Sequence, residues 1–289
     1  MSNKIILGSA NFGNDYSIGN QKKLSNKIIF SILRHYSSRV NIAVDTASSY
    51  NDSESIIGNF NLKNKNKIKV ITKFNFSDKL DISEMYQKSF LRLKKKPLAI
   101  LFHNSKDYFN QLKRKNLFKL KSDNLVKKVG VSIYTTKEIE KILRLKKNIP
   151  DIIQLPINLF DNRAYKTGLL KKLKQKNIEL HARSVFLRGI LFYNQKKLIK
   201  HFPSYEKNIN SLSLISLKKK LNLGYLSLCF VNTIDEIDKI VLGVRDKNHL
   251  NSIINCLKTK LSYQDMSDIL KHSINNKEVI NPSKWKIKY

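Results

Sequence analysis

The sequence predicts an α/β fold in which eight parallel strands and the helices between them close into a single (β/α)8 TIM barrel. Eight short apolar runs recur along the chain, and most are followed by a segment with apolar residues at helical spacing. The runs are apolar throughout, as expected of parallel strands buried on both faces. No glycine-rich GxGxxG turn follows the first run, which argues against a Rossmann domain.

The expected strands are short runs rich in isoleucine, valine and leucine. Some end at a glycine or a polar residue, and Gly8 to Gly13 forms the first such turn. The expected strands are residues 4–8, 41–45, 68–74, 98–103, 126–132, 151–155, 178–184 and 237–243.

Helices are expected after most of these strands. Asp52 or Ser53 can cap the helix at 52–60, and Thr135 or Thr136 can cap the helix that ends at 145. The remaining expected helices are 24–36, 81–93, 108–120, 166–176, 212–222, 223–232, 248–257 and an extra helix at 262–274.

Two segments depart from the regular alternation. Residues 185–210 contain Pro203 and several aromatic residues, and we expect an elaborated loop over the site. Residues 281–289 form a polar and aromatic tail after the extra helix. No low-complexity linker interrupts the 289 residues, so we expect a single domain spanning 1–289.

The cysteines and the hydropathy pattern indicate the compartment. Cys229 and Cys256 lie in apolar segments without metal-like spacing, and we interpret them as buried free thiols. The start of the chain carries no signal-like apolar run, and no window reaches the length of a membrane span. We therefore expect a cytoplasmic protein without a metal site or membrane contact.

The charge is unusual, because 55 Lys and Arg face 22 Asp and Glu, a formal net charge of +33. Such an excess raises the alternative of a basic barrel that binds nucleic acid or another polyanion. However, the lysines are spread over expected helix faces, and abundant Asn and Ile accompany them, as AT-rich coding would produce. We therefore favour solvated helix faces over a nucleic-acid site.

Four polar side chains lie at or just after the carboxyl ends of three consecutive strands. They are Asp45, Tyr50, Lys73 and His103. Taken singly, such a lysine can simply reach solvent, and such a histidine can be a satisfied core residue. In a parallel barrel all carboxyl ends face one side, so these four side chains are expected to converge at one mouth.

These four residues resemble the Asp, Tyr, Lys, His tetrad of the aldo-keto reductase family. The resemblance extends over roughly residues 4–257. It includes an LGxxxxG turn at 7–13, a Ser-Glu helix start with a glycine at 53–58, a GVS strand end at 130–132, a QxxxN pair at 154–158 and a phosphate-side segment at 243–245.

The resemblance implies reduction of a carbonyl with hydride from a nicotinamide cofactor. Tyr50 would supply the proton as general acid. Lys73 would lower the pKa of this tyrosine from about 10, through an interaction on the order of 4 kcal/mol at about 4 Å. Asp45 would hold Lys73 charged and aimed, and His103 would orient and polarise the carbonyl.

The resemblance also implies a cofactor site. Ser132 and Gln154 match positions that bind the nicotinamide carboxamide. Arg183, beside Ser184, matches the position on which the nicotinamide stacks, where the family often has an aromatic residue. The remaining expected cofactor residues are Gly243 and Arg245. The expected cofactor is NADP(H), with NAD(H) as the alternative, because the usual residues for the adenosine phosphate are replaced here by others, including His249.

The substrate is expected to be an aldehyde or ketone, and a polar, sugar-like compound is one hypothesis. Phe12, Phe186, Tyr193 and Trp285 are candidate walls of its pocket. A second alternative function is a non-catalytic, nucleotide-binding subunit derived from a reductase, against which the complete tetrad argues. The oligomeric state is left open.

Overall fold

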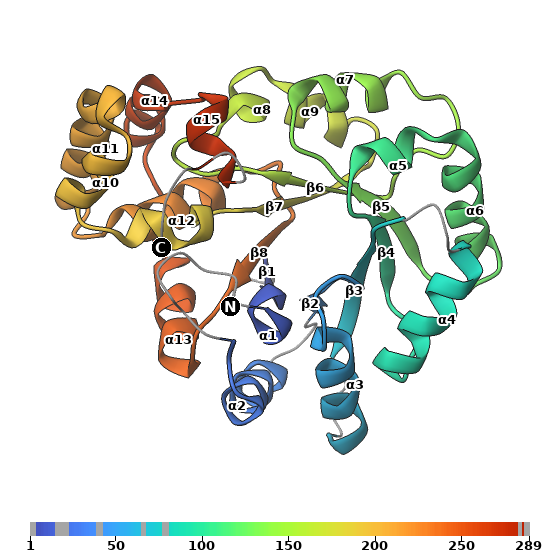
Figure 1. Cartoon of the computed structure of the whole chain (residues 1–289). Helices are drawn as coiled ribbons and strands as arrows, with labels where there is room; N and C mark the ends of the chain where they lie inside the picture. Colours follow the sequence, from blue (N-terminus) through green and yellow to red (C-terminus); the bar gives the residue numbers. More distant parts are fainter. Residues whose placement is uncertain are drawn as a thin grey trace.

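The computed structural model describes residues 4–14, 23–38, 43–64, 68–76, 81–282 and 285, and it confirms the expected barrel. Eight parallel strands pair in sequence order, and the first pairs with the last to close the sheet (Figure 1). The strands are β1 (Ile5–Gly8), β2 (Ala43–Asp45), β3 (Lys69–Phe74), β4 (Ala99–Phe102), β5 (Lys128–Ser132), β6 (Ile152–Pro156), β7 (Glu179–Arg183) and β8 (Lys239–Gly243).

The strands are apolar on both faces because each face meets a different core. Ile6, Ile71, Leu101 and their neighbours form a small buried cluster inside the barrel. Outward-facing residues such as Val44 and Val70 belong to the larger core beneath the helices. Since alternate side chains of a strand point inward, the last inward residue of each strand lies at the carboxyl end of the barrel.

Helices surround the strands in Figure 1. They are α1 (Ala10–Gly13), α2 (Asn26–Ser37), α3 (Ser53–Lys63), α4 (Ile82–Leu93), α5 (Ser105–Phe109), α6 (Gln111–Ser122), α7 (Thr136–Leu143), α8 (Arg163–Lys166), α9 (Leu169–Lys174), the 3-10 helix η1 (Leu187–Phe192), α10 (Gln195–His201), the 3-10 helix η2 (Pro203–Tyr205), α11 (Glu206–Lys218), α12 (Leu223–Thr233), α13 (Lys247–Cys256), α14 (Tyr263–His272) and α15 (Lys277–Ile280).

The predicted caps are confirmed for one helix and wrong for another. Thr135 caps α7 in a capping box, in which the Glu138 carboxylate accepts a hydrogen bond from the Thr135 N–H. Asp52 occupies the N-cap position of α3, but its side chain forms no cap hydrogen bond. It pairs with Lys23 at 2.7 Å instead.

Two predicted helices are each divided in two. The helix expected at 108–120 is interrupted at Asn110, whose extended backbone ends α5 and whose side chain caps α6 by accepting from Lys113 N. The helix expected at 166–176 is interrupted at Gly168, whose φ of +68° lies in the left-handed region. Gly168 also separates α8 from α9.

The elaborated loop expected over 185–210 is largely helical, so this prediction was wrong in form. It contains η1, α10, η2 and the start of α11. The irregular pattern arises because Arg188 and Gly189 have φ of 55° and 92°, which breaks η1 internally. Pro203 then begins η2, and its missing N–H is tolerated at a helix start.

Some expectations fall at the edges of the described chain. Residues 41 and 42 of the second expected strand lie outside the described residues, as does most of the tail after 282. The extra helix is confirmed as α14, and the sequence pattern missed α15.

The cysteines are buried and free, as predicted. Cys229 and Cys256 lie with their sulfurs 3.2 Å apart, between α12 and α13. Among the described helices, none combines the length and apolar character needed to cross a membrane. The described residues also contain no cluster of His, Cys, Asp and Glu that could hold a metal ion.

Candidate active site

A cavity of about 570 Å³ opens at the carboxyl end of the barrel. Its walls come from the ends of the strands and from the loops that follow them. The cavity is lined by every catalytic and cofactor-binding residue predicted from the sequence, namely Asp45, Tyr50, Lys73, His103, Ser132, Gln154, Arg183, Ser184, Gly243 and Arg245.

The deepest part of this cavity holds a buried ion pair. Lys73 Nζ lies 2.5 Å from Asp45 Oδ2, and both residues are less than 5% exposed. Lys73 also donates to Thr46 O at 2.8 Å. Burial lowers the pKa of Lys73, the Asp45 carboxylate opposes this shift, and the charge of Arg183 adds to it. The pair is therefore held in place by the attraction between its two charges and by the hydrogen bond from Lys73 to Thr46 O.

Gln154 connects this pair to the opposite side of the barrel. Its Nε2 donates to Asp45 Oδ1 at 2.5 Å, which the sequence did not predict. A carboxylate only accepts, so the amide nitrogen must face Asp45 and the amide oxygen must face the other way. That oxygen, Oε1, is buried in a residue that lines the cavity and has no hydrogen-bond partner among the described residues.

Tyr50 lies above Lys73, in the loop between β2 and α3. Lys73 Nζ lies 5.4 Å from the centroid of the Tyr50 ring. The loop is fixed by hydrogen bonds from Tyr50 N to Ala47 O and from Ser53 N to Tyr50 O. Gly13 packs directly against it, because a Cβ on Gly13 would lie only 1.9 Å from Tyr50 O. The glycine is thus required for the close approach of α1 to the loop of residues 46–52, which carries Tyr50 and is called the tyrosine loop.

His103 follows β4 directly and faces Tyr50. Their ring centroids are 5.8 Å apart with the planes at 81°, and His103 Nδ1 lies 3.3 Å from Ser49 Oγ. Burial, with the charge of Lys73, lowers the pKa of His103 to about 4. The imidazole is therefore neutral at pH 7, and a neutral ring can still donate one hydrogen bond.

Glu54 anchors the elements that carry this tetrad. It is fully buried at the start of α3 and accepts hydrogen bonds from Thr72 and Ser89. It also forms a salt bridge with Arg92 at 2.7 Å. Thr72 precedes Lys73, so Glu54 joins α3 and α4 to β3 immediately behind the lysine. The sequence pattern placed Glu54 at the helix start but did not reveal these partners.

Arg183 is the last residue of β7, and its guanidinium is fixed by neutral groups. It donates to Ser132 Oγ at 3.1 Å, to Ile133 O at 2.9 Å and to Ser184 Oγ at 3.2 Å. Its carbon Cζ also lies 4.1 Å from the centroid of the Tyr134 ring. Tyr134 lines the cavity and was missed from the sequence, because nothing in its local pattern distinguishes it from other exposed loop residues.

The far end of the cavity lies between β8 and α13. A Cβ at Gly243 would meet no atom within 4 Å, so the space above this strand end is open. His249 Nδ1 accepts from Arg245 N at 3.4 Å, and its Nε2 has no partner among the described residues. Burial and the Arg245 charge lower the pKa of His249 to about 4.

The predicted walls divide into two groups. Phe186 and Tyr193 line the cavity. Phe12 is completely buried in the core, and Trp285 packs against Phe202 away from the cavity, so neither forms a wall. His181 was expected to be structural, and its Nε2 lies 2.9 Å from Glu179 Oε1.

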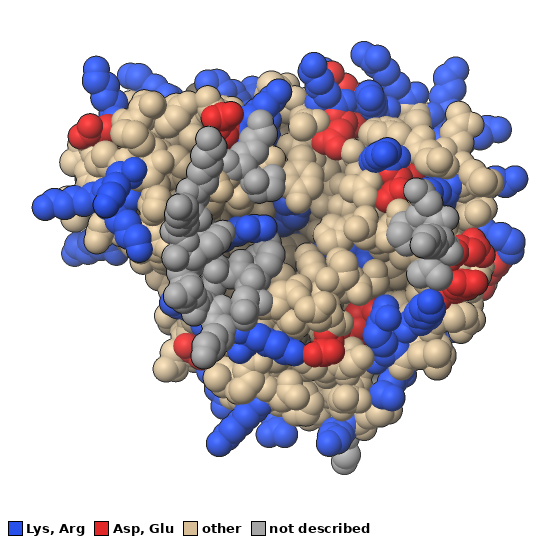
Figure 2. Space-filling view, in the orientation of Figure 1, with Lys and Arg blue, Asp and Glu red and all other residues tan. Residues whose placement is uncertain are grey.

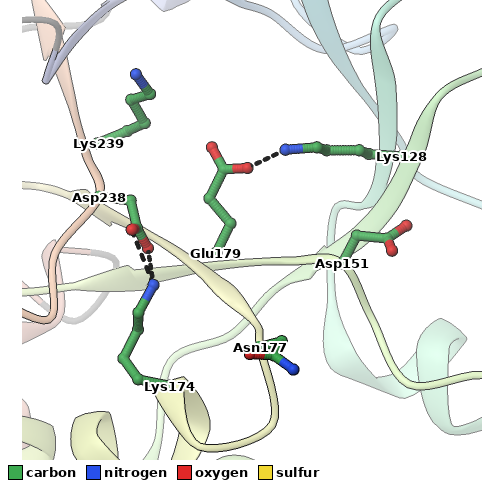
Figure 3. A pocket seen from close by; sticks show the side chains of 7 residues that line it. All are labelled: Lys128, Asp151, Lys174, Asn177, Glu179, Asp238 and Lys239. Carbon is green, nitrogen blue, oxygen red and sulfur yellow. Dashed lines mark hydrogen bonds and ion pairs between the residues drawn. The ribbon is translucent and has the colours of Figure 1, made fainter.

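A second cavity, of about 520 Å³, opens at the amino end of the barrel (Figure 3). Its lining alternates in charge, with ion pairs between Lys128 and Glu179 and between Lys174 and Asp238. None of the predicted site residues lines it.

Basic side chains are scattered around the edge of the face shown in Figure 2, with acidic ones among them. On this face they do not gather in one continuous patch. On this face the distribution fits solvated helix faces better than a nucleic-acid interface.

Comparison with solved structures supports the barrel assignment. A glycerol dehydrogenase from Gluconobacter oxydans has a TM-score of 0.70 at 19% identity, over 94% of this chain and 92% of that one. An aldo-keto reductase from Klebsiella pneumoniae in complex with NADPH has a TM-score of 0.72 at 15% identity, over 99% and 94%. The holo form of an aldo-keto reductase from Bacillus halodurans has a TM-score of 0.72 at 17% identity, over 97% and 95%.

At these identities the solved structures show a shared fold. No curated protein sequence matches this chain significantly. The family model described as "Aldo/keto reductase family" matches residues 4–274, nearly the whole chain. This chain therefore belongs to the aldo/keto reductase family of oxidoreductases.

Proposed function

We propose that this protein is an NADP(H)-dependent reductase that converts an aldehyde or ketone to an alcohol, with hydride from the cofactor and the proton from Tyr50. The observation that carries the proposal is the buried Lys73–Asp45 pair beneath the Tyr50 ring, at the bottom of an open cavity.

Tyr50 is the proposed general acid. When its proton passes to the carbonyl oxygen, a phenolate remains, and the nearby Lys73 ammonium stabilises that charge. Asp45 and the Thr46 carbonyl hold the ammonium in place, so no reorientation is needed during the reaction. Because this pair is buried, its field on Tyr50 is screened less than at the surface.

His103 is the proposed orienting residue. Its neutral imidazole can donate to the substrate oxygen from one nitrogen while Ser49 contacts the other, Nδ1. The Tyr50 hydroxyl and the His103 imidazole would then both donate hydrogen bonds to the same substrate oxygen.

The residues at the strand ends fit a nicotinamide cofactor. The unpartnered Gln154 Oε1 can accept from the carboxamide NH2. The Ser132 hydroxyl, which accepts from Arg183, keeps its own proton to donate to the carboxamide oxygen. Ser184 and the open space over Gly243 suit the remainder of the cofactor, and Arg245 suits a phosphate group. A cofactor bound in this way would supply hydride to the carbonyl carbon.

NADP(H) is the proposed form, with NAD(H) as the alternative. The Klebsiella pneumoniae reductases of similar fold were solved with NADPH or NADP. In this chain Arg188, Arg245 and the donor-capable His249 line the cavity and could meet the additional phosphate. A sugar-like substrate remains a hypothesis, consistent with polar groups at the cavity base and aromatic walls at Phe186 and Tyr193.

Cofactor binding and turnover test the proposal. NADPH and NADH are titrated by fluorescence at low salt, and turnover is then measured over a panel of aldehydes, ketones and sugars. Tyr50→Phe is expected to lower kcat about 10³-fold without loss of cofactor binding. Tyr108→Phe is the matched control, since the Tyr108 hydroxyl bonds to Asn148 O outside the cavity.

Absence of cofactor binding by the wild-type protein would overturn the proposed function. Equal turnover by wild type and Tyr50→Phe would overturn the proton donor while leaving the cofactor assignment intact. Salt-sensitive binding to DNA or RNA that is unaffected by Tyr50→Phe would instead support the polyanion alternative.

A further inference from the structure

Arg183 places a fixed positive charge in the wall of the cavity at the carboxyl end of the barrel; the part of this cavity around Lys73 and His103 is called the inner cavity. Three hydrogen bonds to Ser132, Ile133 and Ser184 hold the guanidinium, and one of its faces lies on the ring of Tyr134. A planar group held by three contacts has little freedom to swing away from a ligand.

This charge has no ion-pair partner among the described residues. Its hydrogen-bond partners among the described residues are two hydroxyls and a backbone carbonyl. The charges that act on His103 together with Arg183 are those of Lys73 and Asp45, and Asp45 is already paired with Lys73 at 2.5 Å. Two cations therefore face one carboxylate in a partly closed space where salt screens poorly.

The neighbouring side chains respond to this excess of positive charge. Burial is the largest cause of the lowered pKa of His103; Lys73 lowers it further, Asp45 opposes the shift, and Arg183 adds to it. Arg183 also acts in the same direction on Lys73. A third positive charge brought into this space would experience the same repulsion.

The inference that follows rests on the proposed function. If Tyr50 protonates the carbonyl oxygen, the hydride must reach the adjacent carbon, so the nicotinamide ring lies at this end of the cavity. Its oxidised form carries a positive ring, whereas its reduced form is neutral and electron-rich. A guanidinium attracts an electron-rich ring and repels a positive one.

We propose that Arg183 makes this site select the reduced nicotinamide over the oxidised one, so that the enzyme is poised for carbonyl reduction. The phosphate groups are common to both redox forms. Arg245, at the far end of the cavity, should therefore act on both equally, whereas Arg183 should change their ratio.

The test is the ratio of the Kd for NADP+ to the Kd for NADPH, measured by calorimetry at low salt. The wild-type ratio is expected to be well above one. Arg183→Gln keeps a hydrogen-bond donor and removes the charge, and it should lower the ratio about tenfold or more. Arg183→Lys keeps the positive charge but lacks the planar guanidinium. Its ratio of Kd values should stay closer to that of the wild type than the ratio of Arg183→Gln does.

Arg245→Met is the matched control, and it should weaken both redox forms while leaving their ratio unchanged. If Arg183→Gln does not fold, Arg183→Met provides the same charge removal with an apolar stem. An unchanged ratio in a folded, charge-free variant at position 183 overturns this inference alone. Failure of the wild-type protein to bind either form overturns the proposed function on which it rests.

Discussion

The two ends of the barrel use charge in opposite ways. At the amino end (Figure 3), Glu179 pairs with Lys128, and Asp238 pairs with Lys174. Asp238 also accepts from the Leu180 N–H, so it holds the start of β7 as well. At the carboxyl end, Lys73 pairs with Asp45, whereas Arg183 has only neutral hydrogen-bond partners among the described residues.

The pattern of unsatisfied groups shows the same difference. At the amino end each carboxylate of the cavity has a described partner. At the carboxyl end, Gln154 Oε1 and His249 Nε2 line a cavity without a described partner. The amino end satisfies its charges internally, whereas the carboxyl end leaves polar atoms unpartnered in its cavity, as the proposed function requires of a ligand site. Substitutions at the two ends should therefore separate stability from turnover.

The largest effect is expected at Lys73. Lys73→Met removes one partner of a buried ion pair and leaves Asp45 charged, which should destabilise the fold by about 3–5 kcal/mol. Turnover should fall about 10³-fold. Urea unfolding and steady-state kinetics measure the two effects.

The double variant Lys73→Met with Asp45→Asn separates the loss of stability from the loss of turnover. It should recover much of the stability, since no buried charge remains unpaired, but none of the turnover. If turnover returned with stability, Lys73 would be a structural residue and the contrast between the two ends would weaken.

Gly13→Ala should act on turnover more than on stability. The added Cβ would meet Tyr50 O, so the tyrosine loop must shift, and a misplacement of about 1 Å can cost about 10²-fold in rate. Gly168→Ala is the control, because its Cβ meets nothing while its positive φ costs about 1–2 kcal/mol. Equal turnover in the two variants would show that the tyrosine loop tolerates displacement.

Acid should weaken the two ends in different pH windows. The pKa of His103 is lowered from 6.5 to about 4, so the unfolded chain binds the proton first. Its contribution to stability is lost as the pH falls from 6.5 toward 4. At the amino end, burial raises the pKa of Glu179, but His181 and Lys128 outweigh it and lower the value from 4.5 to about 2.

The stability that Glu179 contributes is therefore lost only between pH 4.5 and about 2. Thermal melts recorded from pH 8 to pH 3 should show His103→Gln flattening the upper part of the Tm profile and Glu179→Gln the lower part. Both variants altering the same window would contradict the separation of the two ends.

The smallest effect is expected at Asp238. Asp238→Asn keeps an acceptor for the Leu180 N–H and loses the ion pair with Lys174, so it should cost about 1 kcal/mol. Turnover should equal that of the wild type. A marked loss of turnover would mean that the amino end contributes to the reaction.

The sequence predicted the barrel and the convergence of Asp45, Lys73 and His103 because both follow from periodicity. Strand ends in a parallel barrel share one face, and the last inward residue of each strand is readable from the pattern. The interruptions at Asn110 and Gly168 were not predicted, because a single residue changes the backbone there while the apolar spacing on both sides continues.

Contacts between distant residues were equally unpredictable. The hydrogen bond from Gln154 to Asp45 joins residues 109 positions apart, and the packing of Arg183 on Tyr134 joins the end of β7 to the loop after β5. Neither contact leaves a local signature, since each depends on how the barrel closes. The sequence predicted the pairing of Lys73 with Asp45, but not the place of Tyr134 in the cavity wall or the bond from Gln154.

If the cofactor binds as proposed, the hydrogen bond between Gln154 and Asp45 also bears on which chemical variants of the cofactor the site would accept. Because the carboxylate fixes the amide nitrogen, Gln154 offers the cavity an acceptor only. An acid analogue of the cofactor, with a carboxylate in place of the carboxamide, would bring only further acceptors to that oxygen. In the proposed binding mode, Gln154, held by Asp45 from the opposite side of the barrel, would favour the amide form of the cofactor over the acid form.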